Sequence, residues 1–276
     1  MSQQKSPIGV FDSGYGGLTI LAEMQARLPQ YDFLYLGDNA RAPYGSRSFD
    51  VVYEFTLEAV KYLFSQGCEL VILACNTASA KALRNIQQKD LPGLAPHKRV
   101  LGVIRPSAEI VDEMTGNGHV GILATEGTVK SLSYEIEIRK FSPETTVVQH
   151  ACPMWVPLIE NNRHESEAGR MFIREDVERL LAKDPLIDTI VLACTHYPIL
   201  KSYLESIVPP TVKIVAQGPI IAEKLTDYLL RHPELEQRCS KNGQLEFLTT
   251  ENSLDFDRKA SLFMEREVKS THIRLV

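Results

Sequence analysis

Two short stretches, VILACNT (71–77) and IVLACTH (190–196), decide the fold class. In each, a continuous apolar run ends in a cysteine that small polar residues follow. Strands that are apolar on both faces are typical of parallel sheets covered by helices. Outward from these stretches, similar apolar runs alternate with segments of helical spacing. This alternation predicts an α/β fold built on open parallel sheets.

The expected elements continue this alternation through both halves of the chain. We expect strands at 8–11, 32–36, 70–74, 100–104, 120–123, 146–150, 189–193 and 212–215. We expect helices at 18–28, 49–64, 77–88, 129–141, 174–182, 200–207 and 222–230. Ser48 is a candidate N-cap for the second of these helices, and Gly67 lies just past its end.

An internal repeat relates the two halves. The cysteines of the two opening stretches are 119 residues apart, at 75 and 194. A second pair, GVFDSGYG (9–16) and GILATEGT (121–128), is offset by 112 residues. The similar offsets predict one structural unit that occurs twice. In each unit, strands are expected to end at the edge of a ligand-binding crevice. We therefore expect two pseudo-symmetric parallel-sheet domains that face each other across a cleft.

Composition narrows the class of protein. The 276 residues are 44% hydrophobic and 24% charged, which indicates a soluble globular chain. The net charge of −5 argues against non-specific binding to nucleic acid or anionic membranes. No apolar run approaches the roughly 20 residues of a membrane span. The N-terminal MSQQKSPIGV lacks the apolar stretch of a signal peptide, so we expect a cytoplasmic protein.

The five cysteines do not predict disulfides or a zinc ribbon. Their number is odd and none are spaced as CxxC. Cys68, Cys152 and Cys239 have no polar motif around them and are expected to be structural. A buried cysteine is often only a small hydrophobic residue, so this alternative stays open for the other two as well.

Cys75 and Cys194 are nevertheless candidates for acid/base chemistry. Each is expected at the end of a buried strand, immediately before a helix. A helix N-terminus lowers a thiol pKa from its reference of about 8.5. If the halves face each other, the two thiols flank one ligand. One thiolate can then remove a proton from a carbon while the opposite thiol returns a proton to the other face. The pattern thus predicts inversion at the α-carbon of an amino acid.

Six motifs, in order, carry a resemblance that spans nearly the whole chain. They are FDSGYGGLT (11–19), GDNARAPYGSRS (37–48), LACNTASA (73–80), GILATEGTVKS (121–131), CPMWVPLIE (152–160) and LACTHYPIL (192–200). By these motifs the chain resembles the glutamate racemases of the aspartate/glutamate racemase superfamily. The resemblance implies interconversion of L- and D-glutamate, which supplies D-glutamate for peptidoglycan, without pyridoxal phosphate or metal. It also implies that the chain can form a homodimer.

The resemblance further implies roles for individual residues. Cys75 corresponds to the base that acts on the D-enantiomer and Cys194 to the base that acts on the L-enantiomer. The side chains expected to assist proton transfer are Asp12, Glu160 and His196. The residues expected to hold substrate are Asp12, Ser13, Pro43, Tyr44, Gly45, Asn76, Thr77, Thr125, Thr128, Thr195 and His196.

Explanations without a catalytic role remain open for the residues expected to assist proton transfer. Asp12 before a glycine turn could be only a helix cap, His196 a surface histidine, and Glu160 a solvated carboxylate. Cysteine and histidine are also zinc ligands, so Cys75, Cys194 and His196 could bind zinc, although the resemblance argues against it.

The resemblance also sets the expected domain boundaries and one departure. It places residues 1–104 and 215–276 in a first domain and residues 105–214 in a second. Arg105, in GVIRPSA (102–108), stands where the family usually has glutamate, which bears on contacts between domains or subunits. The alternatives to glutamate racemisation are a racemase of a related substrate such as aspartate, and a non-catalytic amino-acid-binding regulatory protein.

Overall fold

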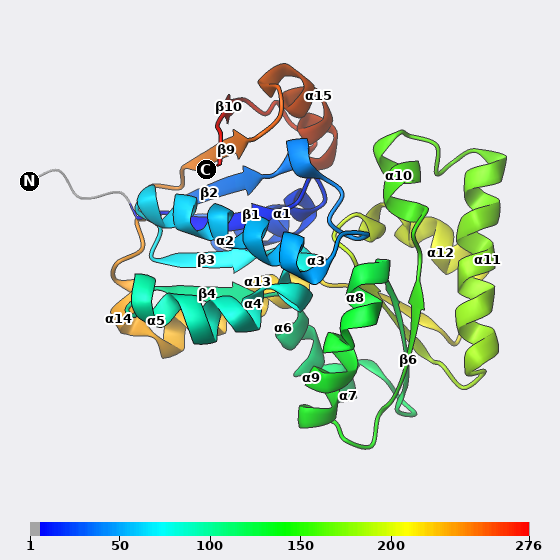
Figure 1. Cartoon of the computed structure of the whole chain (residues 1–276). Helices are drawn as coiled ribbons and strands as arrows, with labels where there is room; N and C mark the ends of the chain where they lie inside the picture. The colour runs from blue at the N-terminus through cyan, green and yellow to red at the C-terminus, as the bar shows by residue number, and fades with distance from the viewer. Residues whose placement is uncertain (1–5, 276) are drawn as a thin grey trace, which may run out of the picture.

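The computed structural model describes residues 6–275, which form two parallel sheets flanked by helices (Figure 1). The six-stranded sheet contains β1 (Ile8–Asp12), β2 (Phe33–Gly37), β3 (Leu70–Leu73), β4 (Arg99–Gly102), β9 (Leu245–Thr249) and β10 (Ser270–His272). The four-stranded sheet contains β5 (His119–Ala124), β6 (Thr146–Ala151), β7 (Thr189–Ala193) and β8 (Lys213–Ala216).

The order of the strands reveals the internal repeat. The sheets read β10-β9-β2-β1-β3-β4 and β6-β5-β7-β8, and all of these neighbours pair in parallel. The run β2-β1-β3-β4 therefore has the same order as the whole second sheet. The predicted α/β class and the predicted pseudo-symmetry of two parallel sheets are both confirmed. The strands that carry the two candidate thiols, β3 and β7, occupy equivalent positions.

The helices lie on both faces of each sheet. The first half contains α1 (Gly17–Arg27), η1 (Asn39–Arg41), α2 (Phe49–Ser65), α3 (Asn76–Lys81), α4 (Leu83–Asn85), η2 (Ile86–Asp90), α5 (Leu91–Leu94), α6 (Ile104–Ala108) and α7 (Val111–Met114). The second half contains α8 (Glu126–Ser131), α9 (Ser133–Phe141), α10 (Trp155–Glu160), α11 (Glu167–Lys183), η3 (Tyr197–Leu200), α12 (Lys201–Ile207), α13 (Gly218–Arg231), α14 (Pro233–Glu236) and α15 (Ser253–Met264).

Each sheet is buried on both faces, as the apolar runs predicted. In β1, Val10 faces one core together with Ile72, and Phe11 faces the other together with Leu73. In β7, Ile190 and Val191 likewise face two different cores. This double burial fixes the strands, so that their carboxyl ends hold the residues that follow them in set positions.

Three predicted elements differ from the structure. The strand expected at 100–104 ends at Gly102, and α6 begins at Ile104, where the chain leaves the sheet. The helix expected at 77–88 is interrupted near Ala82 and becomes a π-helical turn at Ile86–Asp90. Pro92, which has no N–H to donate to the preceding turn, follows that π-turn and accounts for it.

The helix expected at 129–141 is divided at Leu132, which has a φ of 56°. The Ser131 side chain provides alternative backbone partners there, because its hydroxyl donates to Thr128 O and accepts from Ser133 N. The other expected helices are present, although α11 begins seven residues earlier than 174. Ser48 caps α2 as predicted, since its hydroxyl accepts from Val51 N.

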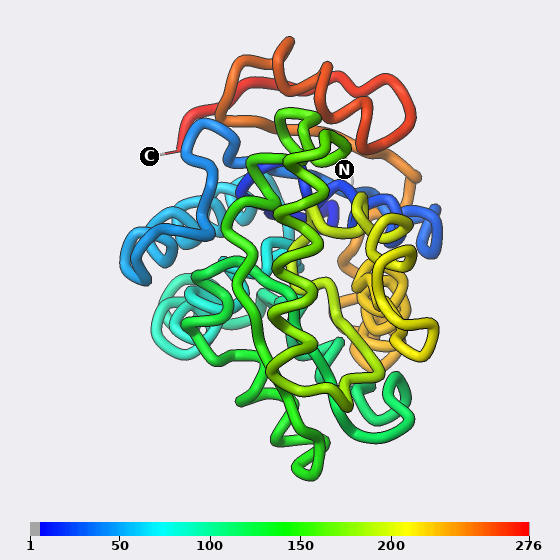
Figure 2. Tube along the Cα trace, turned by 90° about the vertical axis from the view of Figure 1, so that its right-hand side faces the viewer, coloured from blue at the N-terminus to red at the C-terminus, as the bar shows by residue number. Residues whose placement is uncertain are grey.

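The C-terminal segment completes the six-stranded sheet. Strands β9 and β10 extend that sheet beyond β2, and α15 packs against α1. Both views show this orange-to-red segment at one end of the molecule, next to β2 (Figure 1) and across the top of the trace (Figure 2). Within residues 6–275, no helix has the length and apolarity needed to cross a bilayer.

Candidate active site

A cavity of about 170 Å³ lies where the carboxyl ends of the two sheets meet. This volume is below the roughly 300–1,000 Å³ of sites for drug-sized ligands and suits a single small molecule. Both candidate thiols line it. The other lining residues that the sequence predicted are Ser13, Pro43, Tyr44, Gly45, Asn76, Thr77, Thr125, Glu160, Thr195 and His196. Two predicted residues, Asp12 and Thr128, are fully buried behind this lining.

Cys75 is the N-cap of α3, as its place after a buried strand predicted. Its Sγ accepts from Ala78 N at 3.5 Å and lies 3.4 Å from the Ser13 hydroxyl. The expected lowering of its pKa is wrong. Burial, together with the neighbouring Asp12 carboxylate, raises the pKa of Cys75 to about 12. Hydrogen bonds from Ser13 and from Ala78 N, at the start of α3, lower the pKa but do not offset this desolvation.

Cys194 has a different setting. Contrary to expectation, no helix begins directly after Cys194. Thr195 and His196 come first, and the short η3 follows them. The Sγ of Cys194 lies 4.0 Å from His196 Nδ1, and His196 Nε2 lies 2.9 Å from Glu160 Oε1. Burial by itself lowers the pKa of His196. The contacts with Cys194 and Glu160 outweigh burial and raise it to about 10.

His196 is therefore no surface histidine. Its side chain is 6% exposed, and the Glu160 carboxylate that pairs with it is 22% exposed. At neutral pH the raised pKa keeps the imidazole protonated, so a positive charge stands beside Cys194. The His196 ring also makes a T-shaped contact with Phe263 of α15, with centroids 6.0 Å apart.

Asp12 links the glycine turn to the opposite side of the cavity. Its carboxylate accepts from Gly14 N at 2.9 Å and from Thr195 Oγ1 at 3.4 Å. A backbone bond from Gly17, the first residue of α1, adds a capping role. Burial raises the pKa of Asp12, while the positive charge of His196 opposes that rise. Asp12 therefore both caps α1 and lies near the candidate proton-transfer groups.

Hydroxyl groups from both sheets converge on one wall of the cavity. Thr77, in α3, lies 2.9 Å from Thr125, which follows β5. Thr125 is in turn 3.1 Å from Thr128. These oxygens, with the N–H groups at the start of α3 and α8, provide donors suited to a carboxylate.

A loop at 42–48 closes another side. Pro43, Tyr44 and Gly45 line the cavity, and the Tyr44 hydroxyl donates to the buried Asp38. Gly45 O accepts from Gly127 N at 2.8 Å, across the junction of the two sheets. A Cβ on Gly45 would lie only 2.9 Å from the Thr125 Cβ, so glycine permits this approach.

Several lining residues were not predicted. They are Gly14, Ala42, Ser46, Glu126, Cys152, Pro153, Val156 and Pro157. Four of them belong to CPMWVPLIE, the motif from which only Glu160 was selected, so the motif itself was the available signal. Cys152, expected to be structural, is 1% exposed and lies against this cavity.

Among the residues described, one group of metal-ligand type gathers its donor atoms within 4.8 Å, and it comprises His150, Cys152 and Asp176. The Asp176 carboxylate accepts from Trp155 Nε1 at 2.8 Å and lies 2.9 Å from His150 Nε2. Both its oxygens thus serve hydrogen bonds within α10, α11 and β6.

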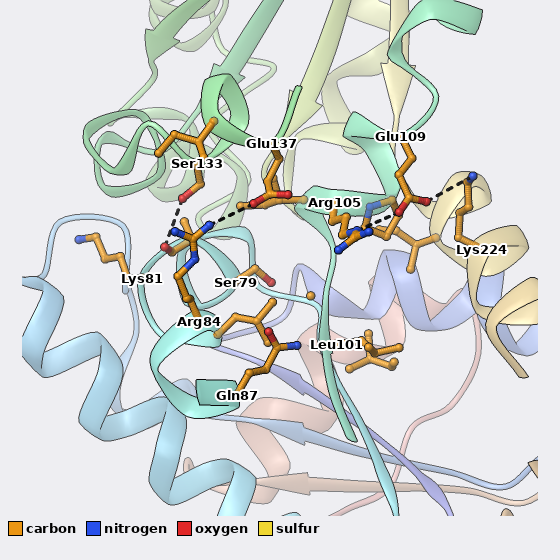
Figure 3. Close-up of a pocket in the computed structure, with 18 of the residues that line it drawn as sticks. Ser79, Lys81, Arg84, Gln87, Leu101, Arg105, Glu109, Ser133, Glu137 and Lys224 are labelled. Carbon is orange, nitrogen blue, oxygen red and sulfur yellow. Dashed lines mark hydrogen bonds and ion pairs between the residues drawn. The ribbon is translucent and has the colours of Figure 1, made fainter. Parts of the chain in front are cut away.

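A second, larger cavity of about 680 Å³ is lined in part by Ser79 and Lys81, near the C-terminal end of α3 (Figure 3). Both of its carboxylates are in ion pairs: Glu137 pairs with Arg84 at 3.4 Å, and Glu109 pairs with Arg105 at 2.9 Å and with Lys224 at 3.5 Å. Arg105 thus makes an ion pair within its own helical segment. None of the cysteines lines this cavity, so the smaller one is the candidate active site.

Comparisons with known proteins agree with this geometry. The family model described as Asp/Glu/Hydantoin racemase matches residues 18–225. A glutamate racemase of Streptococcus agalactiae is 37% identical over 98% of both chains.

Solved structures give the same relationship. A glutamate racemase of Bacillus anthracis has a TM-score of 0.89 at 32% identity, covering 99% of this chain and 98% of that one. One of Francisella tularensis in complex with D-glutamate has a TM-score of 0.86 at 31% identity, with the same coverage. The chain therefore belongs to the Asp/Glu/Hydantoin racemase family.

Proposed function

We propose that this protein is a glutamate racemase, which interconverts L- and D-glutamate by transferring protons between the α-carbon and two cysteines. One observation carries the proposal: Cys75 and Cys194 follow equivalent strands of the two sheets and line the same small cavity. The 37% identity to a glutamate racemase over nearly the full length supports the choice of substrate.

The reaction needs no change of oxidation state. In the D-to-L direction, the Cys75 thiolate takes the α-proton as the C–H bond breaks, and the Cys194 thiol protonates the opposite face. In the L-to-D direction the roles reverse. After one turnover, the cysteine that began as a thiolate is protonated and the other cysteine is a thiolate. Exchange of protons with water restores the starting state.

The difficulty is the weak acidity of the α-proton. A buried thiolate is a stronger base than one in water, which is the effect seen in the raised pKa of Cys75. The ammonium group of the substrate brings positive charge into the cavity and favours the thiolate. Hydrogen-bond donors around Thr77, Thr125 and Thr195 stabilise negative charge as it spreads onto the α-carboxylate.

The remaining candidate residues have supporting roles. Ser13 contacts the Cys75 sulfur, while His196, paired with Glu160, contacts that of Cys194. Asp12 holds the glycine turn and faces Thr195. We assign binding of the substrate to Ser13, the loop at 43–45, and the start of α3 and α8.

The proposal extends to the organisation of the whole protein. Residues 1–104 and 215–276 would form one domain and residues 105–214 the other. Each sheet draws its strands from one of these parts, except that the last two residues of β8 in the four-stranded sheet lie past the boundary at 215. We also propose a homodimer in the cytoplasm, where D-glutamate enters peptidoglycan synthesis and where thiols stay reduced.

Proton NMR in D₂O tests the function directly. Purified protein without added cofactor should remove the α-proton signal of L-glutamate, and a chiral assay should detect D-glutamate. Aspartate, incubated in parallel, should exchange far more slowly. Exchange of aspartate in preference to glutamate would favour the related-substrate alternative. Binding of glutamate without exchange would favour a regulatory role.

A further inference from the structure

A closed ring of three hydrogen bonds lies directly behind the Cys75 side of the cavity. Asn76 Nδ2 donates to Gln217 Oε1 at 2.8 Å, and Gln217 Nε2 donates to the Tyr134 hydroxyl at 2.8 Å. The hydroxyl donates in turn to Asn76 Oδ1 at 2.6 Å. All three side chains are at most 3% exposed. Each member of the ring therefore depends on the other two.

The Val103 carbonyl, which accepts from Gln217 Nε2, fixes the orientation of the ring. Turning over Asn76 alone would bring its Oδ1 against Gln217 Oε1, turning over Gln217 alone would bring its Nε2 against Asn76 Nδ2, and burial leaves little access for water to compensate. Both polar atoms of the Asn76 side chain are used within the ring, although the sequence predicted that Asn76 holds substrate. The backbone N–H of Asn76, as the first residue of α3, and the second hydrogen on Asn76 Nδ2 can still serve a ligand.

The ring also joins the two points at which the chain passes between the sheets. Gln217 follows β8, and its Nε2 lies 2.7 Å from Ser107 Oγ and 3.2 Å from Val103 O, just after β4. Tyr134 comes from α9, beside the four-stranded sheet, whereas Asn76 immediately follows Cys75. Contacts of α6 with α3, α9 and α13 surround this junction (Figure 1).

We propose that Gln217 and Tyr134 are positioning residues for Cys75. The ring ties the first residue of α3 to both crossings, so it sets the distance and direction of the Cys75 thiol relative to the opposite thiol. Two-base proton transfer needs both sulfurs aligned with one carbon, and a displacement of about 1 Å can cost roughly 10²-fold in rate. This inference rests on the proposed function, which supplies the reaction.

Two variants break the ring with little change of volume: Tyr134→Phe and Gln217→Met. Tyr31→Phe is the matched control. It removes a partly buried hydroxyl that donates to Glu236 at 2.6 Å, and the buried Tyr31 precedes β2 at the amino end of the sheet, away from the cavity. We expect kcat to fall at least about tenfold in both ring variants, with a smaller change in KM. The control should keep the wild-type kcat.

Isotope effects separate positioning from a general structural defect. If the step at Cys75 becomes slower, substrate deuterated at the α-carbon should show a larger isotope effect for D-glutamate and a smaller one for L-glutamate. Equal changes for both enantiomers, or a kcat that matches the control, would overturn the proposal.

A measurement without turnover keeps the two proposals separate. Mapping of iodoacetamide alkylation by mass spectrometry should show a changed rate at Cys75 in both ring variants and an unchanged rate at Cys194. An unchanged rate at Cys75 would also overturn the positioning role. Inactive wild-type protein would instead refute the proposed function, with the alkylation result still deciding the role of the ring. If Gln217→Met fails to fold, Tyr134→Phe decides.

Discussion

The two candidate thiols have neighbours of opposite charge. Cys75 lies close to the Asp12 carboxylate, and Cys194 lies 4.0 Å from the protonated His196. The sequence predicted similar surroundings for both, because both follow an apolar strand and precede small polar residues. Local sequence could identify the thiols but not their charge environment, since Asp12 and Glu160 come from distant parts of the chain. The free protein therefore presents two unlike acid/base groups.

Loss of either thiol should abolish racemisation if both act. We expect Cys75→Ser and Cys194→Ser each to reduce kcat at least ~10²-fold, since serine is a far weaker acid than cysteine. Circular dichroism at a single wavelength follows the conversion of each enantiomer. Cys239→Ser, a buried thiol outside the cavity, is the control and should retain activity. Full activity in either test variant would indicate a one-base mechanism.

The pKa of His196 makes stability depend on pH. Its pKa rises from about 6.5 in the unfolded chain to about 10 in the fold, through its contacts with Cys194 and Glu160. The resulting stabilisation is complete below the unfolded pKa and disappears as pH rises through the folded value.

His196→Gln tests this dependence. We expect the variant to be less stable than wild type in urea unfolding at pH 7, and the difference to shrink by pH 10. A difference that is constant with pH would mean that the proton on His196 does not contribute to folding.

At the scale of elements, apolar patterning located the strands well and the helices less regularly. Continuous apolar runs identified β3 and β7 almost residue by residue, because both faces of these strands are buried. The breaks at Leu132 and around Ile86 depend on hydrogen bonds of Ser131 and on Pro92, which helical periodicity does not detect. The short strand β10 has no apolar run to reveal it.

The start of α1 illustrates how tightly elements of the two sheets meet. Gly16 is its N-cap, and a Cβ there would lie 2.3 Å from Thr195 Oγ1 and 2.5 Å from His196 Nδ1. Gly16→Ala should therefore push the Thr195–His196 segment away from Asp12. We expect a loss of about 1–3 kcal/mol of stability, as for overpacked sites, and a fall in kcat.

Gly93→Ala is the matched control for that substitution. A Cβ on Gly93, within α5, meets nothing within 4 Å. The change should be neutral or stabilise by roughly 0.5–1 kcal/mol, because alanine favours helix more than glycine. Equal stability and activity of the two variants would contradict the close approach at Gly16.

At the scale of the whole molecule, the internal repeat in the sequence predicted more of the architecture than the individual expected helices and strands did. Two short matches were enough to predict paired sheets, because they mark equivalent strand ends, β1 with β5 and β3 with β7. The ring around Gln217 could not be predicted in this way. It joins residues from α3, α9 and the crossing before α13, which only the relative placement of the two sheets brings together.

A cavity shared by both sheets predicts that substrate stabilises the entire protein. A ligand that binds only the folded state at 100 times its Kd adds about 2.7 kcal/mol of stability, and each kcal/mol raises Tm by roughly 2–4 °C in proteins approaching this size. Wild type would equilibrate the enantiomers during the measurement, so we choose the double variant Cys75→Ser/Cys194→Ser. Its Tm should rise with L-glutamate and with D-glutamate, and rise less with L- or D-aspartate, whose shorter side chain leaves part of the cavity unfilled. A larger rise with aspartate would assign the pocket to the smaller substrate, whereas no rise with any of the four amino acids would show that the cavity does not bind them.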